Sequence, residues 1–132
     1  SAAAQDQKID HRLLVEFDGR VYLRFSNTPF TGATQEKNRI FRKYKNGLLH
    51  GQKLEVYRNS QLKRKVTYQN GKLDGSFEDY YQNGKVDTSG FWANDKATAI
   101  WTRYHENGNK WAYGRYENDE LNGEFISCYE NG

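Results

Sequence analysis

The sequence predicts an all-β protein, in which an antiparallel meander of β-hairpin repeats forms one elongated, twisted sheet. A Tyr/Trp-x-Asn-Gly/Asp phrase begins at Tyr44, Tyr68, Trp92 and Tyr116, always at the same spacing. A second phrase centred on asparagine recurs between these copies with the same period, beginning at Tyr57, Tyr81, His105 and Tyr129. An uninterrupted period of about 24 residues, punctuated by turn residues, is typical of a repeat array.

The composition fits such a fold. Of the 132 residues, 36% are hydrophobic and 15% are aromatic. Disordered chains are poor in aromatic residues, so a thin core built from large rings is expected instead. The single proline and the lack of a long apolar run argue against a membrane-spanning helix. One cysteine, Cys128, excludes an intrachain disulfide.

The chain divides into three segments in order. Residues 1–12 are small and polar and are expected to be poorly ordered. Residues 13–43 are expected to form an N-terminal hairpin, which turns at Asp18-Gly19, and a short first repeat, which turns near Lys37-Asn38. Pro29 separates the two, since proline cannot donate to a β-ladder. Residues 44–132 are expected to form four β repeats.

Asparagine-centred turns fix the predicted pairing of the strands. Asn-Gly supplies the positive φ angles of a two-residue hairpin turn, so we expect such turns at residues 46, 59, 70, 83, 94, 107, 118 and 131. Two-residue turns would place five pairs of residues opposite each other: Phe77 with Gly90, Tyr81 with Val86, Trp101 with Gly114, Gly90 with Ala99, and Gly114 with Gly123. A ring across a glycine restores packing where a side chain is missing.

Alternation along the strands divides the side chains between two faces. A periodic face repeats in every unit and is expected to be structural; it comprises Tyr57, Leu62, Val66, Tyr68, Leu73, Phe77, Tyr81, Val86, Trp92, Trp101, Tyr116, Leu121, Phe125 and Tyr129. A non-periodic face follows no period, and residues that the repeat does not require are expected to carry function; it comprises Leu54, Val56, Arg58, Lys63, Lys65, Glu78, Tyr80, Phe91, Ile100, Tyr104, Trp111, Tyr113, Arg115 and Ile126.

The Tyr-x-Asn-Gly-x-Leu-x-Gly phrase, as in residues 68–75, resembles the bacterial MORN-repeat variant found in YwqK-type antitoxins. The segment Asn27-Thr28-Pro29-Phe30-Thr31-Gly32 is similar to the leader that often precedes the first repeat. The likeness covers roughly residues 13–132. It implies a β-repeat scaffold without catalysis, and some members of the family neutralise toxins as antitoxins or immunity proteins. Departures such as Asn59-Ser60, Asn94-Asp95 and His105 in place of tyrosine put the regularity of single turns in doubt.

Catalytic and metal chemistry is not expected, and neither is a cofactor. His11, His50 and His105 are far apart, and no Cys/His spacing indicates a metal site. Cys128 is best explained as a small apolar residue on a strand. Glu55, Asp79 and Arg103 share one repeat position, where an ion pair with Arg64 or Arg103 is favoured over acid–base catalysis.

The sequence therefore favours a protein-binding module that occludes a bacterial toxin or secreted effector. Its expected contact residues combine aromatic anchors with basic side chains; they are Arg58, Lys63, Lys65, Tyr80, Phe91, Tyr104, Trp111 and Tyr113. Residues 1–72 hold 15 Lys and Arg against 6 Asp and Glu, whereas residues 73–132 hold 5 against 11. The basic first half would steer an acidic partner.

Two alternatives stay open. The basic half could bind anionic membrane lipids, or edge strands could join copies into a structural scaffold. Nucleic acid is not an expected partner, because such binders are more often basic throughout. Residues 1–4, Ser-Ala-Ala-Ala, fit either an engineered start or the remainder of a removed signal peptide, and an exported location is favoured over a cytoplasmic one.

Overall fold

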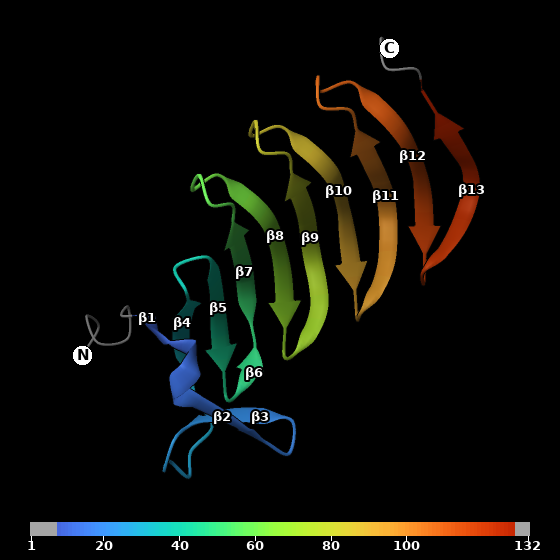
Figure 1. The fold of residues 1–132 in the computed structure, drawn as a ribbon. Coiled ribbons are helices and arrows are strands. Elements are labelled where there is room, and N and C mark those ends of the chain that lie inside the picture. Colours follow the sequence, from blue (N-terminus) through green and yellow to red (C-terminus); the bar gives the residue numbers. More distant parts are fainter. Residues whose placement is uncertain (1–7, 129–132) are drawn as a thin grey trace.

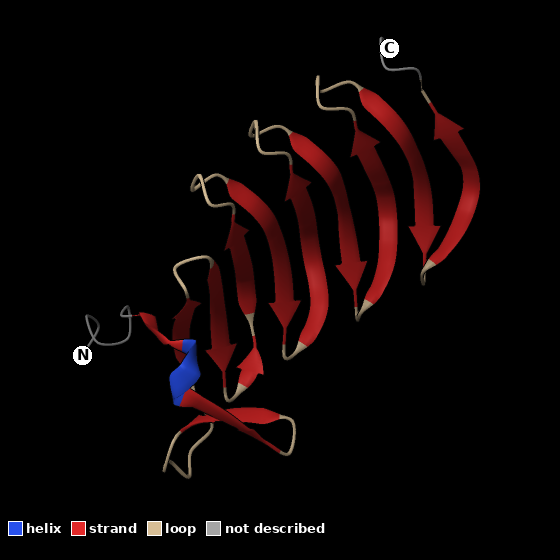
Figure 2. Cartoon of the chain, viewed as in Figure 1, coloured by secondary structure: helices blue, strands red, loops and turns tan. Residues whose placement is uncertain are grey.

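The computed structural model of the chain describes residues 8–128, which are almost entirely β (Figures 1 and 2). An open sheet of 11 strands has the order β1-β4-β5-β7-β8-β9-β10-β11-β12-β13, and a small strand β6 pairs with β5. From β4 onward the neighbours in space are also neighbours in sequence, so the strands follow one another from one end of the sheet to the other. The predicted all-β meander is confirmed.

The strands of the array lengthen after the first repeat. The first part contains β4 (Gly32–Glu36), β5 (Ile40–Lys45), β6 (Leu48–Leu49) and β7 (Gly51–Val56). The remaining strands are β8 (Leu62–Gln69), β9 (Lys72–Tyr80), β10 (Val86–Ala93), β11 (Lys96–Tyr104), β12 (Lys110–Glu117) and β13 (Glu120–Ser127). All of these pairs are antiparallel, as the meander requires.

The N-terminal region differs in part from expectation. The expected poor order of residues 1–12 stays a prediction: residues 1–7 lie outside the described residues, and residues 8–12 belong to a short strand and a turn. Strand β1 (Lys8–Asp10) pairs in parallel with β4, and a short 3-10 turn, η1 (His11–Leu13), follows it. The predicted hairpin is present as β2 (Leu14–Phe17) and β3 (Arg20–Leu23), which form a separate two-stranded sheet.

The first class of asparagine turn has the predicted two-residue geometry. Both central residues have positive φ at Asn46-Gly47, Asn70-Gly71, Asn94-Asp95 and Asn118-Asp119. These are the angles of a type I′ turn, whose twist matches that of the flanking strands. Each of the last three turns also stacks on the preceding one, because the N–H of its second residue donates to a carbonyl just beyond that earlier turn, as Gly71 does to Leu49 at 2.7 Å.

The second class of asparagine turn is longer than predicted. At Tyr81–Lys85 the loop has three residues, with hydrogen bonds from Gly84 N to the Tyr81 oxygen and from Tyr81 N to the Lys85 oxygen. Only Gly84 has positive φ. Asn83 instead uses its side chain, which accepts from the Lys85 N–H at 2.9 Å. The same pattern is found around Asn59 and Asn107, and the turn expected at residue 131 lies outside the described residues.

The longer loop shifts the pairing by one residue, and a β-bulge then restores it. Val86 pairs with Tyr80 rather than with Tyr81, but beyond the bulge Phe77 faces Gly90 as predicted. The extra residue in each of the three repeats falls at the same position of the period, at Lys63, Asp87 and Trp111. A bulge redirects the side chain of the residue it inserts.

A second irregularity corrects two more predicted pairs. Gly114 pairs with Phe125 and not with Gly123, because the register shifts between Gly114 and Tyr116. A similar shift between Ser89 and Phe91 leaves Gly90 beside Trp101 rather than Ala99. The predicted pair of Trp101 with Gly114 is confirmed.

The bulges also change the face on which four residues lie. Leu62 and Val86 pair with Val56 and Tyr80, so they belong to the non-periodic face rather than the periodic one. Lys63 and Trp111 move the opposite way, since each lies against the periodic-face residue that begins its turn (Tyr57 or His105).

The sheet is a single layer with very little core. Tyr44 and Val66 are the buried hydrophobic side chains among the described residues, 8% and 3% exposed. Cohesion comes from contacts between successive repeats along the periodic face. Phe77, Trp92 and Trp101 form an aromatic cluster with ring centroids 5.1–6.4 Å apart. The hydroxyls of Tyr57 and Tyr81 donate to the carbonyls of Tyr80 and Tyr104 in the following repeat.

Candidate protein-binding surface

Five of the eight predicted contact residues share the non-periodic face over β8–β12; they are Lys65, Tyr80, Phe91, Tyr104 and Tyr113. They do not form one cluster of free side chains. Lys65 forms an ion pair with Glu78 at 3.2 Å, and hydrogen bonding to that carboxylate raises the pKa of Lys65. At the far end Lys110 lies over the Tyr113 ring, 4.9 Å from its centroid.

The other three predicted residues lie elsewhere. Arg58 is exposed in the turn between β7 and β8. Lys63 lies over the Tyr57 ring at 5.7 Å, and Trp111 stacks on His105 with centroids 5.0 Å apart. The bulges therefore place Lys63 and Trp111 on the periodic face, and their predicted position on the non-periodic face is wrong.

Exposed apolar side chains gather at the C-terminal end of the array. Phe91 and Ile100 project from the non-periodic face, whereas Trp111, Leu121 and Phe125 belong to the periodic face. Equivalent positions in earlier repeats, such as Leu73 and Phe77, are more covered. Phe125 is 55% exposed and Trp111 is 41% exposed.

A groove of about 340 Å³ runs over the periodic face of β11–β13 and has an aromatic lining. Its lining includes Trp101, Trp111, Tyr116, Phe125, Arg103 and the small side chain of Ala112. Most of this wall is apolar, and hydroxyls of Thr88 and Ser127 supply polar edges. We call these residues the aromatic groove.

Stacking fixes the position of Trp111 at the groove edge. One side of the ring lies nearly parallel to His105, with an interplanar angle of 17°. The Arg103 guanidinium lies 4.5 Å from the ring centroid and pairs with Asp87 at 3.7 Å. Arg103 is exposed, so this arrangement leaves a cationic group at the rim of an aromatic surface.

His105 explains why Trp111 can lie there. At the same position of earlier repeats, Tyr57 and Tyr81 extend a hydroxyl to the next repeat. The imidazole of His105 makes no such bond, and its Nε2 is buried without a hydrogen-bond partner among the described residues. The ring instead provides a flat surface for the indole of Trp111.

The remaining candidate groups are structural in their contacts. Arg64 and Asp79 form a two-fold hydrogen-bonded ion pair with bonds of 2.6 and 3.0 Å, which confirms the predicted ion pair at this repeat position. His50 Nδ1 accepts from the Asn70 N–H. Cys128 is half-buried. Residues 8–128 contain no group of three or more His, Cys, Asp or Glu side chains that could hold a metal ion, and none of their helices has the length and apolarity to cross a membrane.

The aromatic groove was not predicted as a site, although Trp101, Tyr116 and Phe125 were all assigned to the periodic face. The missing information was the bulge that brings Trp111 to the same side. The longer loop before Lys63, Asp87 and Trp111 was visible in the sequence only as an alternation of wider and narrower spacings between successive asparagine turns.

The period, the turns and the stacking of repeats agree with a known family. The family described as MORN repeat variant matches residues 49–70, 73–94 and 97–118, which together make half of the 132-residue chain. The chain belongs to the MORN repeat variant family. The three matched MORN repeats run from β6 to the turn after β12, and the aromatic groove lies over the last matched repeat and β13. MORN repeats are generally non-enzymatic modules for binding.

Other comparisons add little to this assignment. No curated protein matches the chain. A chain of the "Glycosylation Associate Protein (Gap123) complex from Streptococcus agalactiae" is similar over 89% of this MORN repeat chain, with 15% identity and a TM-score of 0.41. The match covers 20% of that longer chain.

Proposed function

We propose that this MORN repeat chain is a non-catalytic module that binds another protein through the aromatic groove and occludes it. A bacterial toxin or a secreted effector is the proposed class of partner. Some members of the family that the sequence resembles neutralise toxins as antitoxins or immunity proteins.

The observation that carries the proposal is the aromatic groove itself. Interfaces are enriched in Trp, Tyr, Phe and Arg at their centres, and a few such residues supply most of the binding energy. Trp111 and Phe125 are exposed there, yet stacking already fixes Trp111. A preorganised ring loses little conformational freedom when a partner covers it.

The distribution of charge favours a protein over a membrane surface. Arg64 and Lys65 belong to the basic first half, but each is paired with a carboxylate across the neighbouring strand. They also point to opposite faces, because side chains alternate along β8. Arg64 and Lys65 therefore do not join into one basic patch for a lipid headgroup layer, and the net positive first half would steer a protein with an acidic contact surface.

The decisive experiment compares three immobilised chains as baits for proteins of the native organism. They are the natural sequence, a groove variant with Trp111→Ala and Phe125→Ala, and a control with Phe17→Ala. Phe17 is 73% exposed on the N-terminal hairpin, so its truncation removes a similar ring at the opposite end of the molecule. Circular dichroism checks that all three stay β-rich.

We expect the natural chain and the Phe17→Ala control to retain a toxin or effector, and the groove variant to release it. Loss of two anchor rings at about 1–2 kcal/mol each lowers affinity by roughly 30-fold or more. The captured protein should also lose its harmful activity in the presence of the natural chain or the Phe17→Ala control, but not in the presence of the groove variant. Equal affinity of the groove variant would contradict the proposed surface, and a partner that stays active when bound would contradict occlusion.

A further inference from the structure

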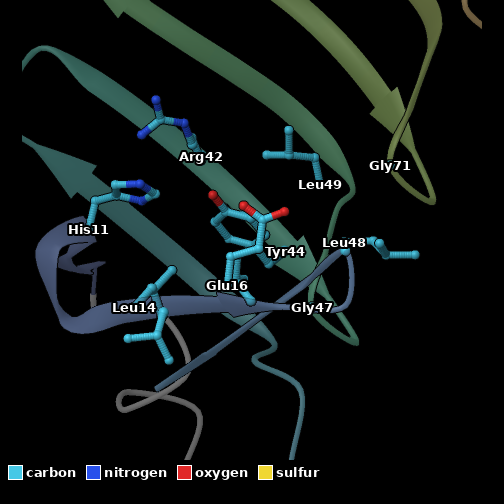
Figure 3. Close-up of a pocket in the computed structure, with 12 residues that line it drawn as sticks. His11, Leu14, Glu16, Arg42, Tyr44, Gly47, Leu48, Leu49 and Gly71 are labelled. Atoms are coloured by element: carbon cyan, nitrogen blue, oxygen red, sulfur yellow. The ribbon is translucent and has the colours of Figure 1, made fainter. Parts of the chain in front are cut away.

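A cavity lies between the N-terminal hairpin and the start of the array, away from the aromatic groove (Figure 3). Its volume is about 420 Å³, within the range of roughly 300–1,000 Å³ that small-molecule sites occupy. Arg42 and Tyr44 of β5 form the sheet wall, and His11 and Glu16 from η1 and β2 form the hairpin wall.

The two walls are held together by hydrogen bonds next to the cavity. The Val21 N–H donates to the Gly47 carbonyl at 3.0 Å, and the Phe30 N–H donates to the Val21 carbonyl at 2.9 Å. Arg20 Nη1 adds a bond to the Asn46 carbonyl at 2.5 Å. Gly47 has no room for a side chain, since a Cβ there would lie 2.8 Å from the Cβ of Arg20. The hairpin is therefore docked on the first turn of the array, and the cavity is pre-formed.

Polar groups converge on this space. The Arg42 side chain is 16% exposed and binds Glu36 through Nη1 at 2.8 Å. Tyr44 is buried beside it. His11 Nδ1 is buried and has no hydrogen-bond partner within residues 8–128. Figure 3 shows the His11 ring and the oxygens of Tyr44 and Glu16 facing the same region, with the Arg42 guanidinium above them and directed away from Glu16. Unsatisfied buried polar atoms are rare in native proteins and call for a bound group or water.

The charges of the two walls are opposite. Arg42 supplies a guanidinium on the sheet side, and Glu16 supplies a carboxylate at the exposed mouth on the hairpin side. Leu14, Leu48 and Leu49 form an apolar part of the lining. Glu36 takes only Nη1 of Arg42, so the other N–H groups of this guanidinium remain available to a ligand carboxylate. A small zwitterion with an apolar side chain would place its carboxylate on these donors, its ammonium at Glu16 and its side chain on the leucines.

We propose that this cavity binds a free α-amino acid with an aliphatic side chain. The carboxylate of the ligand meets Arg42 and the Tyr44 hydroxyl, because a guanidinium is well suited to a carboxylate. The ammonium meets Glu16, and the side chain packs on the leucines. This site is separate from the proposed protein-binding groove, and neither depends on the other.

The test is a calorimetric and NMR titration of the full chain with L-leucine, N-acetyl-L-leucine and L-leucinamide. The first carries both charges, and the other two each lack one. We expect L-leucine to bind and to shift resonances of η1, β2 and β5, and each capped compound to bind at least tenfold more weakly. Glu16→Gln should weaken L-leucine by roughly tenfold and should remove its advantage over N-acetyl-L-leucine.

Glu124→Gln on β13 is the matched control, because it changes an exposed glutamate at the opposite end of the sheet, and it should leave the affinity unchanged. Glu16 is exposed, so its replacement should not prevent folding. The proposal is overturned if neither L-leucine nor L-valine binds at about 10 mM, or if Glu16→Gln has no effect. Equal or tighter binding of N-acetyl-L-leucine would also overturn it, and would indicate the carboxyl end of a peptide as the ligand.

Discussion

At the scale of single residues, one position of the period controls how successive strands fit together. Gly51, Gly75, Ala99 and Gly123 occupy this position in successive repeats, and all have positive φ, from 61° to 127°. Around this position the later strand of each pair contains two more residues than the earlier strand. Tyr68 pairs with Leu73 and Val66 pairs with Phe77, so a step of two residues in β8 matches a step of four in β9. Ala99 is the one side chain in this series, at a backbone conformation that favours glycine.

Exchanging residues at this position should have opposite effects in two repeats. Ala99→Gly should stabilise the protein by up to about 1 kcal/mol, because relief of left-handed strain exceeds the entropic cost of glycine. Gly75→Ala should destabilise it by about 2 kcal/mol or more, since its φ is 127° and the new Cβ would lie 2.9 Å from Thr67. Urea denaturation of both variants measures the two free energies of unfolding. A loss of stability in Ala99→Gly would show that packing of the methyl group outweighs the strain.

Aspartate replaces glycine in two of the type I′ turns for a reason that a single turn does not reveal. The Oδ1 atom of Asp95 accepts from the Leu73 N–H at 2.7 Å, and that of Asp119 accepts from the Ala97 N–H at 2.5 Å. Each carboxylate therefore joins its turn to the previous one. These departures from Asn-Gly strengthen the contact between repeats at the same point where the sequence alone suggested irregularity.

At the scale of elements, the asparagine that recurs in the period forms two kinds of turn. Asn70 adopts positive φ in a two-residue loop, whereas Asn83 caps a three-residue loop through its side chain. The period, the strands and the pair of Phe77 with Gly90 were predictable because they depend on spacing alone. The position of Trp111 was not, because one inserted residue in the bulge decides its face.

The candidate site residues divide in the same way, into those that strand spacing alone could place and those that it could not. Lys65, Tyr80, Phe91, Tyr104 and Tyr113 were predicted to share one face, and strand alternation was enough to place them. The cavity behind the N-terminal hairpin had no signal in the sequence, since β2 and β3 leave the period of the array. Its walls meet because Val21 and Gly47, which are distant in sequence, are hydrogen-bonded to each other.

Docking of the N-terminal hairpin should weaken at mildly acidic pH. Burial, and then the charge of Arg42, lower the pKa of His11, while Glu36 and Asp10 oppose this effect and Lys53 adds to it. The folded state therefore disfavours the protonated imidazole, so its contribution is complete above the unfolded pKa of about 6.5 and is lost as the pH falls toward the lower folded pKa. Hydrogen exchange at β2–β3 amides, corrected for intrinsic rates, should speed up as the pH falls below about 6.5.

His11→Gln is the control for that change, because it should flatten the pH dependence over the same window. The carboxyls of Asp10 and Glu36 titrate lower, since hydrogen bonds from Arg12 and Arg42 lower their pKa values. An unaltered profile in His11→Gln would assign the effect to another group.

At the scale of the whole molecule, the sheet has one layer, and each strand from β5 onward packs chiefly on its neighbours in sequence. Stability in such an array is a sum of terms for single repeats and for contacts between adjacent ones. The buried side chains of Tyr44 and Val66 lie in β5 and β8, whereas β13 is exposed along nearly its whole length. Stability should therefore fall toward the C-terminal strand.

Hydrogen–deuterium exchange should show this gradient directly. We expect protection factors in β8 and β9 to exceed those in β12 and β13 by about tenfold or more, which corresponds to about 1.4 kcal/mol of local opening free energy. Mass spectrometry of peptides from each hairpin measures the difference. The same protection in all repeats would show that the array unfolds as one cooperative unit.

The arrangement of hydrogen bonds in this single layer has a mechanical consequence. The first and last strands of the array are at opposite ends of the ribbon (Figure 1). A force applied between them acts perpendicular to the strands. It therefore breaks the interstrand hydrogen bonds of the outermost hairpin one after another, instead of loading many hydrogen bonds in shear at once. The molecule should thus yield to tension in small successive steps of one hairpin each, extending gradually as a tether would.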